Sequence, residues 1–290
     1  MRARVTASTD MSLVAGLDFG GGAVKACVAR VSDGEVIAIA ARSTETSHPA
    51  PGRAEFEPAA WWSAARAAMR EAVEIAARPA DDYIAVTATS LRQGYVQIDD
   101  QGELGPGVLN SDRRGAPQLE RVRTTIGADR LYETTGHWSA PQLTLPKLLQ
   151  EQDADPERWA RTECVLFVHD WALWRLSGTR CSEPSMASAG QLLDIRERRW
   201  AHEIMSDLGL DPAVLPPLQD AGTVAGELRD PGLGLPTGLP VLVGCGPLQW
   251  SVPGPAGQFA GLLHECAPAQ RCLAPQAPHQ TPAQLGPPRS

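Results

Sequence analysis

The chain has 290 residues, a length that allows one large domain or two small ones. Hydrophobic residues make up 43% and charged residues 21%, which excludes collagen, a coiled coil and wholesale disorder. The formal net charge of −8 argues against a nucleic-acid-binding protein and against binding to an anionic membrane surface, since both need a basic face.

The composition changes near residue 246. From Pro247 to Ser290 there are nine Pro and six Gln, and only Glu265, Arg271 and Arg289 are charged. Such a segment cannot bury enough apolar surface to fold. We therefore expect a disordered start over residues 1–11, one folded domain over 12–246, and a Pro/Gln-rich tail over 247–290 that is disordered or translated out of frame.

The six cysteines include no C-x-x-C pair, which predicts reduced thiols in a cytoplasmic protein. There is no apolar run of 18 residues, and residues 1–10 lack the apolar core of a secretory signal. Met11 is a second possible start of translation.

The first predicted elements are three strands, over residues 13–19, 23–31 and 35–41. Gly20, Gly21 and Gly22 form the first turn, and Asp33-Gly34 is a hairpin signal. Asp18 lies at the end of the first strand. This order is strand–turn–strand, which differs from the strand–turn–helix of a P-loop or a dinucleotide-binding unit.

Strands and helices then alternate, which predicts an α/β fold. A helix is expected from Glu57-Pro58 to about residue 77, with Pro in its first turn. The further expected strands are 83–89, 95–98, 164–168 and 239–243, and the further expected helices are 115–126, 143–151, 156–161, 170–176 and 202–208.

The segment GLDFGGGAVK at residues 16–25 resembles the first phosphate motif of the FGGY carbohydrate kinases, members of the actin-like (ribonuclease H-like) ATPase superfamily. Six more segments resemble family motifs in the same order: 55–62, 90–102, 111–114, 135–149, 169–178 and 238–246. On this resemblance the chain is identified as the N-terminal half of a two-domain sugar kinase with an α/β, actin-like fold. The loop SLRQG at 90–94 looks closest to the autoinducer-2 kinase and glycerol kinase branches, whereas xylulokinase-like members more often carry Gln-Met-His-Gly there.

The resemblance implies a site for the phosphates of ATP at the first turn. The N–H groups of Gly20, Gly21 and Gly22 would form an anion cradle, because glycine allows close approach and a positive φ. Asp18 would hold Mg²⁺ through water, and Lys25 would add positive charge. The alternative is an ordinary tight hairpin with a solvated lysine, and the family's usual hydroxyl residues are absent at Gly21 and Gly22.

The resemblance also implies a site for a small-molecule sugar or polyol. Arg92 and Gln93 stand where glycerol kinase-like members contact substrate hydroxyls, and Gln142 stands where they carry a substrate-facing Tyr. The alternative is a surface loop with a salt-bridged arginine. Asp112 is expected to be a helix N-cap. Asp170 and its neighbouring tryptophans are expected to be structural, and neither His137 nor His169 is given a catalytic role.

The general base expected for this family is missing. Family members carry Gly-x-Gly-Asp-x-Gln after the late strand, and here Gly244-Cys245-Gly246 is followed by Pro247. A proline side chain accepts no proton. We therefore expect a truncated or frameshifted kinase that is inactive alone, completed by a separate C-terminal half or acting as a homodimer. The alternatives are a non-catalytic sugar-binding or regulatory fragment, or a product that does not fold stably.

Overall fold

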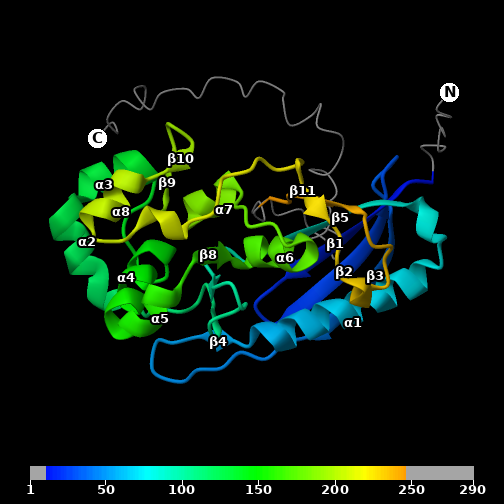
Figure 1. Cartoon of the computed structure of the whole chain (residues 1–290), viewed down its shortest axis with the longest axis horizontal. Coiled ribbons are helices and arrows are strands. Elements are labelled where there is room, and N and C mark those ends of the chain that lie inside the picture. Colours follow the sequence, from blue (N-terminus) through cyan, green and yellow to red (C-terminus); the bar gives the residue numbers. More distant parts are fainter. Residues whose placement is uncertain (1–10, 246–290) are drawn as a thin grey trace, which may run out of the picture.

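The computed structural model describes residues 11–245, which form two sheets with helices packed against them (Figure 1). Residues 1–10 and the tail from 246 onward, including Pro247, lie outside the described residues. The predicted boundaries at residues 11 and 246 therefore stay predictions.

The larger sheet has six strands in the order β11-β12-β5-β1-β2-β3. Strands β1 (Leu13–Phe19), β2 (Ala23–Arg30) and β3 (Val36–Ser43) form an antiparallel meander, which confirms the predicted first three strands. Strand β5 (Tyr83–Ser90) lies parallel to β1, and β12 (Pro240–Leu242) lies parallel to β5. Strand β11 (Val224–Glu227) closes the edge antiparallel to β12.

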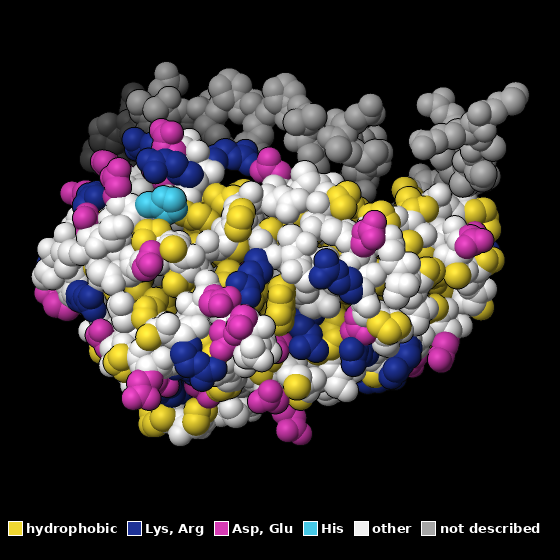
Figure 2. All heavy atoms as spheres, viewed as in Figure 1, with side chains coloured by type: hydrophobic (Ala, Val, Ile, Leu, Met, Phe, Trp, Pro, Cys, Tyr) yellow, Lys and Arg dark blue, Asp and Glu magenta, His cyan; other side chains and the backbone are white. Residues whose placement is uncertain are grey.

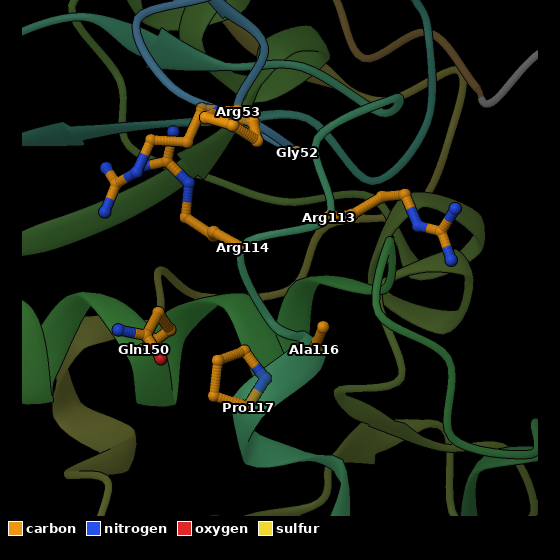
Figure 3. Close-up of a pocket in the computed structure, with 8 residues that line it drawn as sticks. Gly52, Arg53, Arg113, Arg114, Ala116, Pro117 and Gln150 are labelled. Atoms are coloured by element: carbon orange, nitrogen blue, oxygen red, sulfur yellow. The ribbon is translucent and has the colours of Figure 1, made fainter.

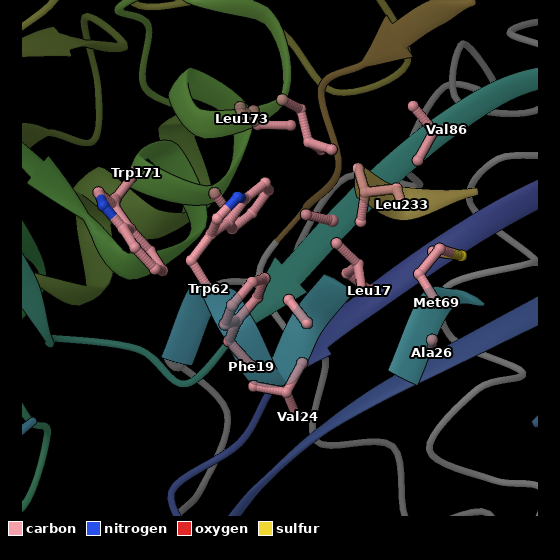
Figure 4. Close-up of a cluster of buried hydrophobic side chains, with 14 of the residues drawn as sticks. Leu17, Phe19, Val24, Ala26, Trp62, Met69, Val86, Trp171, Leu173 and Leu233 are labelled. Carbon is pink, nitrogen blue, oxygen red and sulfur yellow. The ribbon is translucent and has the colours of Figure 1, made fainter. Parts of the chain in front are cut away.

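Helix α1 (Pro58–Ala76) and helix α6 (Val168–Ser177) pack together on one face of this sheet. Alternate residues of β1 face them, because successive side chains of a strand point to opposite faces. Figure 4 shows Phe19 of β1 against Trp62 of α1 and Trp171 of α6, with ring centroids 6.3 and 5.5 Å from Phe19. Burying each such side chain stabilises the fold by roughly 1.5–3 kcal/mol.

The smaller sheet is antiparallel, in the order β4-β7-β6-β8. Its strands are β4 (Glu55–Phe56), β7 (Gly107–Val108), β6 (Tyr95–Ile98) and β8 (Cys164–Phe167). A second apolar cluster joins it to the helices on the left of Figure 1. These are α2 (Leu119–Ile126), α3 (Ala128–Thr135), α4 (Thr144–Ala154), α5 (Pro156–Arg161), α7 (Pro184–Ala189) and α8 (His202–Asp207), with the hairpin β9 (Leu193–Asp194) and β10 (Arg199–Trp200).

The predicted helix over 115–126 is divided. A 3₁₀ turn covers Ala116–Gln118 and α2 follows it. The chain enters this turn through Gly115, where a Cβ atom would lie 2.9 Å from the backbone of Pro146 and Lys147, so only glycine fits against α4.

Among the described residues, no helix is both long enough and apolar enough to cross a membrane. Acidic and basic side chains are interspersed over the face seen in Figure 2.

Candidate functional site

The first turn presents two backbone donors. Gly20 N donates to Ala23 O at 3.0 Å, whereas the N–H groups of Gly21 and Gly22 donate to no backbone acceptor among residues 11–245. Both glycines are exposed, and a Cβ on either would meet no heavy atom within 4 Å. None of the three glycines has a positive φ, so the expectation that the turn needs glycine for that reason is wrong. The feature that still favours ligand binding is the exposure of Gly21 and Gly22.

Asp18 stands at the end of β1, on the face of the sheet opposite to α1 and α6. Its register partners are Lys25 in β2 and Thr89 in β5, which share its face. Burial raises the pKa of Asp18, and the nearby charge of Lys25 opposes that rise. A cation or a positively charged partner at this point would stabilise the ionised carboxylate.

The chain that follows β12 passes beside these residues. Thr89 Oγ1 donates to the carbonyl of Cys245 at 2.9 Å. At Gly244 a Cβ atom would lie 2.0 Å from the carbonyl oxygen of Ala88, so glycine alone permits this approach. The carboxyl ends of three parallel strands therefore meet at one edge of the sheet, which is where ligands bind in open α/β sheets.

The residues at this edge suit Mg²⁺ held largely by ligand and water oxygens. Within the described part of the chain, no group of three or more His, Cys, Asp or Glu side chains could hold a metal ion. Asp18 would supply a single carboxylate, and Mg²⁺ commonly binds through one or two carboxylates together with water and substrate phosphates. The residues present thus fit water-mediated binding, and they do not fit a protein-enclosed metal centre.

The loop that carries Arg92 and Gln93 begins beside the first turn, because Leu91 N donates to the carbonyl of Phe19 at 2.9 Å. Gln93 adopts a left-handed φ of 67°. Gly94 is required for space, since its Cβ would lie 2.6 Å from Leu91 Cδ1 and 2.8 Å from the carbonyl of Val108. Residues 90–94 therefore have a fixed path directly beside the first turn, residues 20–22. After the roles predicted for them, these two segments are called the sugar loop and the phosphate turn below.

The predicted sugar-contacting side chains are accessible. Arg92 and Gln93 are half-buried and Gln142 is exposed just before α4. The pKa of His137 is lowered, first by burial and then by the charge of Arg92, so these two side chains are neighbours. The structure thus brings the sugar loop and the phosphate turn together. The contacts of Gln142 and of Arg92 with a substrate stay predictions.

Asp112 is not the helix cap that we expected. Its Oδ2 accepts from Ala54 N at 2.7 Å and its Oδ1 accepts from Arg114 N at 2.8 Å. The Arg114 guanidinium binds Asp112, Glu55 and Glu151. Asp112 therefore anchors a buried ion network between two loops, because its side chain binds Ala54 N, 58 residues away, and Arg114, instead of the first turn of a helix.

A cavity of about 510 Å³ opens beside this network. Figure 3 shows the Arg113 side chain pointing away from the side chains of Arg53 and Arg114. The network has no excess of positive charge, since Arg53, Arg114 and Arg158 face four carboxylates (Glu55, Asp112, Glu151 and Asp155). The cavity thus carries no argument for an anion site.

The expectation that Asp170 and Trp171 are structural agrees with their complete burial. His169 Nδ1 lies 2.8 Å from Asp170 Oδ1, and both side chains are fully buried. Lys147 was missed as a site residue: its Nζ lies 2.7 Å from the carbonyl of Gln93. A signal was available, because Lys147 is one of two lysines in the chain and lies between apolar residues in LPKLL.

Comparison with known proteins shows which family the chain belongs to. Residues 13–253 match the family described as "FGGY family of carbohydrate kinases, N-terminal domain". The autoinducer-2 kinase of Salmonella paratyphi B is 32% identical over 243 residues, which cover 80% of this chain and 45% of that protein. The xylulose kinase of Streptomyces rubiginosus is 33% identical over 236 residues, covering 81% of this chain and 48% of that protein.

Solved structures give the same range. The xylulose kinase from Rhodospirillum rubrum matches with a TM-score of 0.75 and 29% identity, covering 81% of this chain and 49% of that one. A Plasmodium falciparum glycerol kinase has a TM-score of 0.75 at 15% identity, covering 82% of this chain and 49% of that one, and is similar in fold alone. The chain spans about half the length of the relatives it matches.

Proposed function

Since the chain belongs to the FGGY family of carbohydrate kinases, we propose that its described residues form the sugar-binding and first phosphate-binding half of an ATP-dependent kinase for a sugar or polyol. One observation carries the proposal. The open Gly21-Gly22 turn, Asp18 and the sugar loop emerge from adjacent parallel strands, joined by the hydrogen bond from Leu91 N to the Phe19 carbonyl.

Each group has a part in this reaction. A substrate hydroxyl oxygen attacks the γ-phosphorus of ATP, the bond to ADP breaks, and the hydroxyl proton passes to a base. Arg92, Gln93 and Gln142 would hold substrate hydroxyls, since a guanidinium and amides supply donors and acceptors in fixed directions. The N–H groups of Gly21 and Gly22 would bind phosphate oxygens, whereas that of Gly20, also expected in this role, already donates to Ala23 O. Mg²⁺, when bound, neutralises phosphate charge, and Asp18 would hold it through water.

Proton transfer is the step that this chain lacks. Pro247 stands where the family pattern has an aspartate, and its side chain has no group to accept the proton. We therefore propose that the chain binds sugar without turning it over, and that a C-terminal half supplied separately, or a second copy, would be needed for phosphorylation. A cytoplasmic setting belongs to the same proposal, because ATP is the donor and Cys164 and Cys181 are buried thiols that form no disulfide among the described residues.

The test is titration calorimetry of the full chain with autoinducer-2, xylulose and glycerol, the compounds in the names of the relatives and solved structures given above. We expect one of them to bind, Arg92→Ala to weaken that binding about 10-fold or more, and the exposed control Arg123→Ala to leave it unchanged. If no compound binds, the proposal fails. A coupled assay for ADP release should detect no turnover, and robust release would contradict the role given to Pro247.

The variant Asp18→Asn tests whether the Asp18 carboxylate serves the phosphate site or the stability of the fold. We expect it to leave sugar affinity unchanged and to reduce binding of Mg²⁺-ATP. Because burial raises the pKa of Asp18, its ionised form is unfavourable in the folded state, so the variant should unfold at the same or a higher urea concentration. Loss of the cooperative urea transition in Asp18→Asn would show that the carboxylate is structural.

A further inference from the structure

Lys147 has no role in the function proposed above, yet its side chain ends at the sugar loop, on the carbonyl of Gln93. The side chain is fully buried. Its Nζ donates to the carbonyl of Gln93 at 2.7 Å and to the carbonyl of Leu109 at 3.0 Å. The Tyr95 ring lies on a further side, with its centroid 5.6 Å from Nζ. Fully buried lysines are rare because desolvating the ammonium is costly, so an apolar residue at this position would be expected if only space needed filling.

The Gln93 carbonyl is held from two directions. Besides Lys147, the hydroxyl of Thr144 donates to it at 3.2 Å. Gln93 also has a φ of 67°, in the left-handed region that a residue with a side chain seldom adopts. Such a conformation persists only where its surroundings hold it. The two donors from α4 provide that restraint directly at the peptide that follows Arg92 and Gln93.

The Leu109 carbonyl belongs to a different loop. Leu109 N donates to the carbonyl of Ala54 at 2.9 Å, and Asp112 N donates to the carbonyl of Leu109 at 3.2 Å. This loop continues into the buried ion network at Arg114. A single amino group therefore joins the sugar loop to the loop of that network, across segments that do not neighbour each other in sequence. Asp112 and Arg114 are the charged groups that act on Lys147, in opposite senses.

We propose that Lys147 is a positioning residue for sugar binding: by holding the carbonyls of Gln93 and Leu109 together, it fixes the direction in which Arg92 and Gln93 present their side chains. The ligand part of this inference rests on the proposed function. The restraint of the two loops does not, since it follows from the hydrogen bonds alone. Lys147 touches no substrate in this scheme and acts through the sugar loop.

The restraint is tested by hydrogen exchange with mass spectrometry on the full chain without ligand. In Lys147→Met we expect exchange at least 10-fold faster in peptides covering residues 91–95 and 107–112. Thr144→Val removes a donor to Gln93 alone, so exchange should rise in 91–95 and stay unchanged in 107–112. Met205→Ala, which opens the second core at a fully buried side chain of α8, should move neither segment relative to its surroundings. Rates in Lys147→Met that match those of Met205→Ala would overturn the proposal.

The ligand arm uses the compound that binds most tightly in the calorimetric panel. We expect Lys147→Met and Thr144→Val each to weaken its affinity about 10-fold, Lys147→Arg to restore part of the loss, and Met205→Ala to bind as the unmodified chain does. An unchanged Kd in Lys147→Met overturns the positioning role. If the unmodified chain binds no compound, the proposed function fails while the exchange experiment still decides the restraint. If Lys147→Met does not fold, Thr144→Val tests the restraint of the Gln93 carbonyl that both donors share, and unchanged exchange in 91–95 together with an unchanged Kd overturns the positioning role.

Discussion

Replacing Arg114 with methionine should be far more damaging than the loss of one surface charge. The Arg114 guanidinium is buried against Asp112, Glu55 and Glu151, whose side chains are 0%, 12% and 3% exposed. Glu151 retains Arg158, but Asp112 loses its only side-chain partner among the described residues. Removing one member of a buried ion pair costs about 3–5 kcal/mol, because it leaves an uncompensated charge. We expect a loss of this size in the free energy of unfolding at pH 7.

The loss should shrink as the pH falls from 7 to 5. Burial favours the neutral form of Asp112, and hydrogen bonds from Arg114 and from Ala54 N outweigh it and lower the pKa of Asp112 below its usual value. Without the guanidinium, burial prevails and the pKa rises. A carboxyl whose pKa is raised in the folded state takes up a proton more readily in the folded than in the unfolded chain. Acidification therefore stabilises the folded variant and reduces its loss in the free energy of unfolding.

Urea unfolding followed by circular dichroism at pH 5, 6 and 7 measures this difference. The matched control is Arg123→Met, since Arg123 pairs with Glu120 on the surface of α2 with 63% and 67% of the side chains exposed. Exposed pairs contribute little, so the control should unfold as the unmodified chain does. A cost below about 1 kcal/mol for Arg114→Met, or one that grows toward pH 5, would refute the buried-charge account.

Two further outcomes follow from the packing. Gly244→Ala forces a Cβ against the carbonyl of Ala88 and should lower the free energy of unfolding, measured with urea, by about 2 kcal/mol. The control Gly21→Ala places its Cβ in open space and should leave the free energy of unfolding unchanged. Equal effects of the two variants would contradict the close approach of Gly244 to Ala88. Burial lowers the pKa of Lys147 to about 7, so in a chain whose two lysines are ¹³C-labelled the signal lost in Lys147→Met should titrate near pH 7. Between pH 7 and 9 the unfolded chain keeps the lysine proton that the folded chain has released, so the unmodified chain gains stability relative to Lys147→Met as the pH rises. We expect this gain in the free energy of unfolding to be about 1 kcal/mol per pH unit. A ¹³C signal that shows Lys147 still protonated at pH 9 would contradict this.

The elements that were predicted well are those whose signals are local. Alternating apolar residues with glycine turns predict the meander, and the structure ends β1 and begins β2 at the residues expected, Phe19 and Ala23. Pro58 and the following apolar periodicity predict α1 to within one residue at each end. Strands β4 and β7 were not predicted, because two-residue strands have no periodicity and form only through pairing with strands distant in sequence.

Residues of the candidate site can be predicted from the sequence where they lie in one short motif. Residues that act through contacts between segments distant in sequence were missed. Asp18 and the first turn lie in one hairpin, so a short pattern finds them. The partners of Asp112 include Ala54 N, 58 residues away, and Lys147 Nζ reaches a carbonyl 54 residues away. No local spacing encodes such contacts. A polar side chain within an otherwise apolar stretch is the signal that remains, and it marks Lys147 as a residue that needs a buried partner.

The contacts of Gly244 and Cys245 bear on the proposal that Pro247 replaces the general base. Gly244 is confined against Ala88, and Cys245 accepts a hydrogen bond from Thr89, whose register partner is Asp18. The backbone that leads to Pro247 is therefore held at the sheet edge by contacts that depend on no aspartate. Restoring the side chain by Pro247→Asp would leave those contacts unchanged, so ADP release by that variant alone would show that the base is the only missing part. If the variant stays inactive while still binding sugar, the site needs groups beyond this edge, and a C-terminal half becomes the component to supply.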